Sequence, residues 1–103
     1  FALANAAGVD IKVAADLLAV SWGGSTMVSR SAPITAARDF ENSAAPVRNV
    51  DKDMGIIKQL ANEEGLALDL AVQVQSMFAE MIAQGKKEHD IAAVLEIIEE
   101  RSN

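Results

Sequence analysis

Lys52 and Asp53 are the neighbouring charged residues of this sequence whose types and position best suit ligand chemistry. At about 100° per residue, a helix through this stretch places Lys52 beside Ile56 and opposite an apolar face. Asp53 falls at the edge of that face, which consists of Val50, Met54, Ile57 and Ala61. A lysine ammonium is a compact charge that attracts a small carboxylate, and Gly55 leaves room for a ligand to approach. Residue type alone favours a solvated lysine, and Asp53 is equally suited to tying down its own segment.

The other candidate residues predict no self-contained catalytic or metal site. His89 is the single histidine, so no second histidine shares a metal with it, and we expect it to be an exposed residue before a helix. The "WGGS" stretch lacks the lysine of a phosphate-binding loop and favours a simple turn. Met77 and Met81 have the spacing of core residues. The many glutamates are typical of a solvated helix face, namely Glu63, Glu64, Glu96, Glu99 and Glu100.

Composition bounds the class of protein. The 103 residues suit one domain, and half of them are apolar, which excludes a disordered tail. The sequence contains no cysteine and has no apolar stretch long enough to span a membrane, so we expect a soluble, cytoplasmic protein without a membrane partner. A net charge of −6 argues against nucleic-acid binding. Basic residues nevertheless gather in the middle third, which leaves room for a small anionic ligand.

The apolar residues recur with the period of helices, and the period of strands is absent. "FALANAAG" has the composition of the last turns of a helix that starts before Phe1, so we expect a fragment of a larger protein. Asp10 predicts the cap of a helix to about Ser21, and Ser25 predicts the cap of the next segment. Pro33 interrupts that segment, which predicts two short helical pieces.

Three further helices complete the predicted all-α bundle, a single helical domain over residues 1–103. Pro46 suits the first turn of a helix that runs to about Glu64 and ends at Gly65. Asp69 opens the next helix, which ends at Gly85 and carries an apolar stripe of Leu70, Val74, Met77, Phe78, Met81 and Ile82. Asp90 predicts the cap of the last helix, whose inward residues are Ile91, Val94, Leu95 and Ile98.

This order of elements resembles the C-terminal helical domain of the β-hydroxyacid dehydrogenases, the family of 3-hydroxyisobutyrate dehydrogenase and tartronate semialdehyde reductase. The resemblance spans essentially the whole chain and rests on the "AAG" helix end, the "GGST…APIT…RDF" segment and the helix that closes with "LANEEG". Its most specific part is the pair Lys52-Asp53 followed by "MGIIKQLANEEG". The resemblance implies the fold of the C-terminal domain of 6-phosphogluconate dehydrogenase-like enzymes.

The resemblance also implies a function. In that family an N-terminal Rossmann domain holds NAD or NADP, and the helical domain closes the cleft where a hydride passes between nicotinamide and a small 2- or 3-hydroxyacid. The equivalent of Lys52 points into this cleft, and the aspartate beside it organises the site. Aromatic side chains of several relatives wall the pocket at the positions of Thr26 and Ser31, so the small residues here imply either a roomier, more polar pocket or a substrate that is contacted elsewhere.

The family's catalytic lysine lies upstream of Phe1, so the resemblance places no catalytic residue in this chain, and we expect the chain alone to be inactive. Relatives often carry an aromatic residue where this sequence has Ala45. We expect a homodimer or larger homo-oligomer, because truncation exposes apolar residues such as Leu3. The alternative is a stand-alone helical interaction module without catalysis, in which Lys52 and Asp53 are surface residues. A glycine-rich dinucleotide fingerprint upstream would separate the two hypotheses.

Overall fold

Helices account for all the regular structure in residues 1–102, the part of the chain that the computed structural model describes. The elements are α1 (Ala2–Ala6), α2 (Ile11–Ala19), α3 (Thr26–Ala37), α4 (Val47–Glu63), α5 (Asp69–Ala83), the short 3-10 helix η1 (Ile91–Ala93) and α6 (Val94–Ser102). The predicted all-α class is therefore confirmed. Within the same residues, none of the helices has both the length and the apolar character that crossing a membrane requires.

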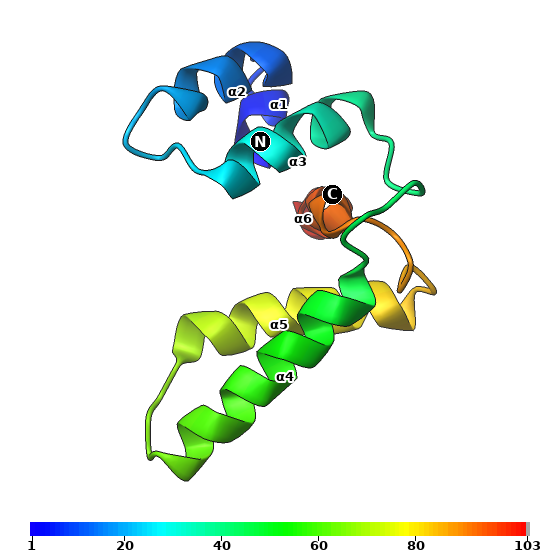
Figure 1. Ribbon diagram of the computed structural model, residues 1–103. Coiled ribbons are helices and arrows are strands. Elements are labelled where there is room, and N and C mark those ends of the chain that lie inside the picture. The colour runs from blue at the N-terminus through cyan, green and yellow to red at the C-terminus, as the bar shows by residue number, and fades with distance from the viewer. Residues whose placement is uncertain (103) are drawn as a thin grey trace.

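The helices form two layers with α6 between them (Figure 1). One layer contains α1, α2 and α3, and the other is the antiparallel hairpin of α4 and α5, which extends away from the rest of the molecule. The chain passes from α3 to α4 through residues 38–46 and returns from α5 to η1 through residues 84–90. These two connections run side by side, since Val47 N donates to His89 O at 2.9 Å and Asp90 N donates to Phe40 O at 2.8 Å.

The predicted helix ends are largely confirmed. The Asp10 side chain accepts a hydrogen bond from Val13 N at 3.1 Å, and the Ser25 hydroxyl accepts one from Val28 N at 3.0 Å. Each satisfies an amide that the first turn of a helix leaves unpaired. Gly65 and Gly85 follow α4 and α5 with φ of +70° and +81°, a conformation that favours glycine. Pro46 stands one position earlier than predicted, at the N-cap of α4.

The predicted break at Pro33 is wrong, because α3 continues through it as one helix of 12 residues. Proline removes one backbone donor and crowds the preceding turn, which costs a helix about 3 kcal/mol when nothing compensates. Pro33 is exposed in an open hollow between α2 and α3, so the carbonyl that loses its partner can be solvated. Its buried neighbours Ala32 and Thr35 anchor the helix against the rest of the fold.

The core lies where the two layers meet α6. Met81, Ile97 and Val47 are its largest fully buried apolar side chains, and Met77 packs against them as the sequence predicts. Several residues of the predicted apolar stripes are exposed instead. Leu70 is 78% exposed, and Ile57, Val74 and Ile98 are between 39% and 44% exposed. Apolar burial therefore concentrates at one end of the α4–α5 hairpin and leaves the other end open.

Candidate functional site

Lys52 and Asp53 lie on the outer face of α4. Their side chains are 68% and 63% exposed, and Lys52 Nζ lies 3.3 Å from Asp53 Oδ1. Ile56, one turn further along the same face, is 58% exposed. The helix geometry predicted for Lys52 and Ile56 is thus confirmed, whereas Asp53 extends into solvent rather than lying against the core. The exposed Lys52 ammonium can bind a small anion, and the exposed Ile56 side chain can pack against a second protein surface.

The two other candidate residues, Thr26 and Ser31, come from α3. Thr26 is exposed at the first position of the helix, after the Ser25 cap. Ser31 is half-buried one and a half turns later, and its hydroxyl lies 3.6 Å from the sulfur of Met27. The Ser31 hydroxyl therefore points toward the Met27 side chain, which makes one side of its environment apolar.

Ser31 lines an open hollow of about 410 Å³ between the two layers. Its walls include Phe1, Met27 of α3, Val50 of α4, Phe78 of α5 and Ile98 of α6. Lys52, Asp53 and Thr26 do not line it. Val50 faces the hollow, and a residue two positions further along a helix points about 200° away, so the structure does not bring Lys52 and Ser31 together in one cavity.

Gly24 of the "WGGS" turn has a structural role. A Cβ atom on Gly24 would lie 2.7 Å from Ala19 O, which is closer than non-bonded atoms approach, so the turn between α2 and α3 requires glycine here. The turn follows a helix and not a strand, so it does not have the strand–turn–helix context of a dinucleotide-binding fingerprint. No three acidic or histidine side chains in the same described region are grouped as a metal site needs.

A buried polar cluster that sequence analysis missed joins α3 to the start of η1. Asp90 is fully buried, and both of its oxygens accept hydrogen bonds from the Arg30 guanidinium, with Nη1 at 2.6 Å from Oδ1. Its Oδ2 also accepts a hydrogen bond from the Ser43 hydroxyl at 2.9 Å, and its Oδ1 one from Ala92 N at 2.9 Å. The predicted capping role of Asp90 is confirmed, and the sequence signal "HD" before an apolar run identified only that role.

The electrostatics of this cluster favour the ionised carboxylate. Burial alone would raise the pKa of Asp90, but hydrogen bonds from Arg30, Ala92 and Ser43 lower it below its ordinary value of 3.8. The Arg30 guanidinium is 26% exposed, and its hydrogen bond to Asp90 raises its own pKa. The pair is therefore charged over the whole physiological range, and its bidentate geometry fixes direction as well as distance.

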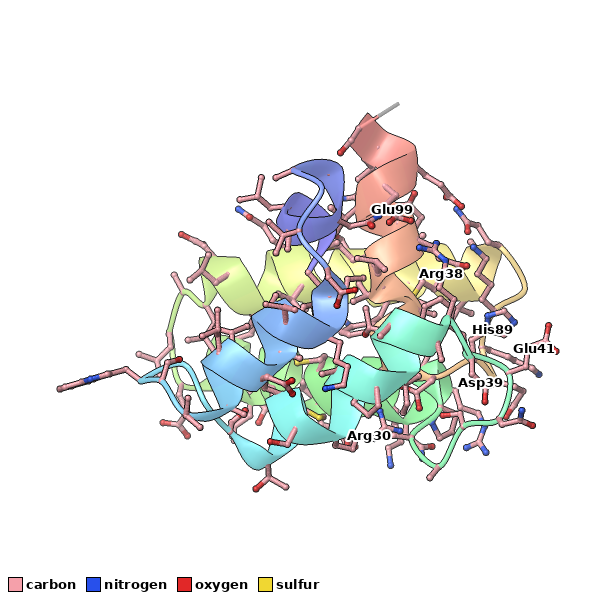
Figure 2. All side chains as sticks on the ribbon, turned by 90° about the horizontal axis from the view of Figure 1, so that it is seen from above. Arg30, Arg38, Asp39, Glu41, His89 and Glu99 are labelled. Atoms are coloured by element: carbon pink, nitrogen blue, oxygen red, sulfur yellow. The ribbon has the colours of Figure 1, made fainter. Side chains whose placement is uncertain are left out.

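Figure 2 shows a second, more exposed ion pair at the other end of α3, where Arg38 and Glu99 of α6 lie together. Arg38 donates through both guanidinium nitrogens, at 2.8 Å to Oε2 and 3.3 Å to Oε1 of Glu99. His89 lies nearby, beside residues 38–46 (Figure 2). It is half-buried, and its Nδ1 is buried without a partner, so the prediction of a simply exposed histidine is wrong. The backbone of the return connection, which donates to and accepts from its neighbours, holds it there.

Comparisons with known proteins match the chain over most of its length. The family described as NAD-binding of NADP-dependent 3-hydroxyisobutyrate dehydrogenase matches residues 1–98. A crystal structure of 3-hydroxyisobutyrate dehydrogenase from Salmonella typhimurium is 27% identical to the chain, with a TM-score of 0.88. The match covers 93% of this chain and 33% of that protein, so the chain spans about a third of the length of its solved relative. None of the curated proteins matches it.

Proposed function

The chain belongs to the family of the NAD-binding helical region of NADP-dependent 3-hydroxyisobutyrate dehydrogenases, and we propose that it closes the active site of an NAD(P)-dependent oxidoreductase. In this proposal the intact protein transfers a hydride between nicotinamide and a small 2- or 3-hydroxyacid. The observation that carries it is the family match over residues 1–98, supported by a shared fold at 27% identity. The chain is a β-hydroxyacid dehydrogenase-type helical domain, and helices are the only regular elements in its described residues.

The residues present suit one side of the cofactor site, and they lack the motif that binds the cofactor's pyrophosphate. Residues 1–102 hold no strand followed by a glycine-rich turn, and such a motif is what binds a dinucleotide pyrophosphate. The bound oxidised cofactor would accept the hydride from the hydroxyacid, and a separate dinucleotide-binding domain would hold it. This chain would contribute Lys52, whose exposed ammonium can bind the carboxylate of the hydroxyacid. Asp53 would orient that ammonium, since the two side chains are already in contact.

The outer face of α4 is the surface that we assign to the substrate. Lys52 and Ile56 are exposed on it, and a closing domain would remove both from water. Removing water strengthens the attraction between ammonium and carboxylate, because the local dielectric falls. Thr26 and Ser31 supply small hydroxyl groups on α3 that would suit a polar substrate, although Ser31 lines the hollow between the layers and not the outer face of α4.

We also propose that the intact protein is a homo-oligomer. The support is a set of exposed large apolar side chains on the layer of α1, α2 and α3, where Trp22 is fully exposed, Val20 is 87% exposed and Leu3 is 82% exposed. Exposed apolar surface of this kind marks association sites. Light scattering of the purified protein at high concentration should give the mass of a dimer or larger, and a strictly monomeric mass would count against this assignment.

The function is tested on the intact protein. The encoding sequence upstream of Phe1 should contain a glycine-rich dinucleotide fingerprint, and the intact protein should reduce NAD or NADP when short 2- and 3-hydroxyacids are supplied. The 103-residue chain alone should turn over none of them. Absence of the fingerprint together with no turnover by the intact protein would leave the interaction-module hypothesis in its place.

A further inference from the structure

We propose that Arg30 and Asp90 are positioning residues that set the placement of α3 relative to α4. The inference rests on the proposed function, because α3 carries Thr26 and Ser31 and α4 carries Lys52. The pair would act on the substrate through these side chains and would not touch the substrate itself. Ser31 lines the hollow between the layers and Lys52 lies on the outer face of α4, and the role of the pair would be to keep these two surfaces in one fixed orientation relative to each other.

The first argument is where the contacts of Asp90 lead. Arg30 is on α3, next to Ser31, and Ser43 belongs to the connection that leads into α4. Ala92 belongs to η1, the short helix that Asp90 caps and that continues into α6. One carboxylate therefore joins α3 and the connection into α4 to the start of η1. Arg30 and Asp90 are 60 positions apart, so nothing local holds them together.

The second argument is that the backbone around Asp90 builds the entrance to α4. Ile91 N donates to Ala45 O at 3.1 Å, and Arg48 N donates to Lys87 O at 3.0 Å. Together with the Val47 and Asp90 amide bonds described above, they join residues 87–91 to residues 40–48 on both sides of the carboxylate. The first turn of α4 is thus fixed to the same backbone that Arg30 holds from α3. A change in the Arg30–Asp90 contact is transmitted to the first turn of α4, one turn before Lys52.

The third argument concerns why an ion pair stands here. A buried ion pair gives little net stability over a well-packed apolar pair, because removing two charges from water is costly. What the pair provides is direction, since a bidentate guanidinium–carboxylate contact fixes the plane and the angle of both groups. Ser43 and Ala92 satisfy the remaining acceptor sites of the carboxylate, so the group has one well-defined orientation.

The chain offers a matched control in Arg38 and Glu99. This pair is also bidentate, but Arg38 stands just after α3, at the start of the connection into α4, and its partner Glu99 is on α6 rather than at the entrance to α4. Losing it should lower stability without moving Lys52 relative to Ser31. An effect that is common to both pairs is therefore structural, and an effect that is specific to Arg30 and Asp90 is positional.

The experiment compares Asp90→Asn, Arg30→Met, Arg30→Lys and Arg38→Met in the intact protein. Positioning predicts that Asp90→Asn and Arg30→Met raise the KM for the hydroxyacid, with a loss in kcat/KM of roughly ten- to a hundredfold. The Kd for NAD(P) should change much less than the KM, since a separate domain would supply most of the cofactor contacts. Arg30→Lys should recover part of the loss, because it keeps the charge and one contact. Arg38→Met should change the melting temperature only.

An unchanged KM in folded Asp90→Asn and Arg30→Lys proteins would overturn the proposal, and Arg30→Lys covers the case in which Arg30→Met does not fold. If the unaltered intact protein turns over no hydroxyacid, the proposed function fails. The positioning role is then tested by a distance measurement that needs no enzymatic activity. Spin labels on Thr26→Cys and Lys52→Cys should give a narrow distance distribution that Asp90→Asn broadens or shifts and Arg38→Met does not. A distribution that Asp90→Asn leaves unchanged would refute the positioning role.

Discussion

Replacing Lys52 with alanine should separate substrate binding from folding. The Lys52 side chain is 68% exposed, and its one charged contact, with Asp53 at 3.3 Å, joins two solvated groups. Such surface pairs contribute about 0 to 1 kcal/mol to the free energy of unfolding. Alanine is a slightly better helix former than lysine, which offsets part of that loss. The free energy of unfolding should therefore change by less than about 0.5 kcal/mol.

Activity should respond much more strongly than stability does. If the Lys52 ammonium binds the substrate carboxylate, its removal takes away a charge-assisted hydrogen bond worth about 1.5 to 3 kcal/mol. That corresponds to a loss of roughly ten- to more than a hundredfold in kcat/KM. The assay is steady-state turnover by the intact protein across a series of short hydroxyacids. Because the contact is to the carboxylate, the loss should be similar for every acid in the series.

Lys58→Ala is the matched control for this prediction. Lys58 is on the same helix and is also exposed, but it borders a hollow near the turn between α4 and α5, away from Lys52. Its removal should leave turnover nearly unchanged, apart from a small effect of losing its aliphatic stem. Full activity of the Lys52 variant on all substrates, combined with a loss in the Lys58 variant, would refute the assignment of the outer face of α4.

Three predictions concern the helical chain itself. Pro33→Ala should raise the free energy of unfolding by about 2 kcal/mol, because alanine restores a helical hydrogen bond. The restriction that proline places on the unfolded chain offsets only part of the cost of proline in the helix. Chemical denaturation measures the change, and a destabilised variant would show that the proline ring is needed for packing. Met81→Ala should lower the free energy of unfolding by about 2 to 5 kcal/mol, because Met81 is fully buried in the core; a change below about 1 kcal/mol would mean that the site collapses around the missing side chain. The folded pKa of Asp90 is below its ordinary value of 3.8, so its contribution is fully present above that pH and is lost as the pH falls through the lower folded pKa. Denaturation at a series of acidic pH values should show this loss, and Asp90→Asn should flatten the profile in that range; an unaltered slope would mean that other carboxylates, such as Glu99, dominate.

Helix boundaries were the most predictable part of the fold, because their signals are local. The Asp10 and Ser25 side chains bind amides three residues ahead, so both ends of each interaction lie in one short stretch of sequence. Gly65 and Gly85 also mark helix ends locally, because the backbone conformation after each helix disfavours most other residues. The core position of Met81 also follows from local spacing.

Pro33 shows where local reasoning fails. Its effect on the helix depends on which side of α3 meets solvent, and that is decided by α2 and η1, elements that lie elsewhere in the sequence. Arg30 gave no signal for a similar reason, as its partner Asp90 is 60 positions away. Leu70 and Val74 fit an apolar stripe that the described residues do not cover. For the candidate site, the sequence located Lys52 on the outer face of α4 but could not tell that Ser31 lies in a separate hollow.

The Arg30–Asp90 contact also has a consequence for the order in which the chain folds. The helices α4 and α5 follow one another in sequence and pack together, so their contacts close short loops and can form early. Bringing Arg30 to Asp90 closes a loop of 60 positions that contains this whole hairpin, and loop-closure entropy opposes it until both ends are structured. We therefore expect the hairpin to form first and the ion pair to lock last. Variants of the pair should mainly accelerate unfolding and leave the folding rate nearly unchanged, whereas variants at the α4–α5 contact should slow folding.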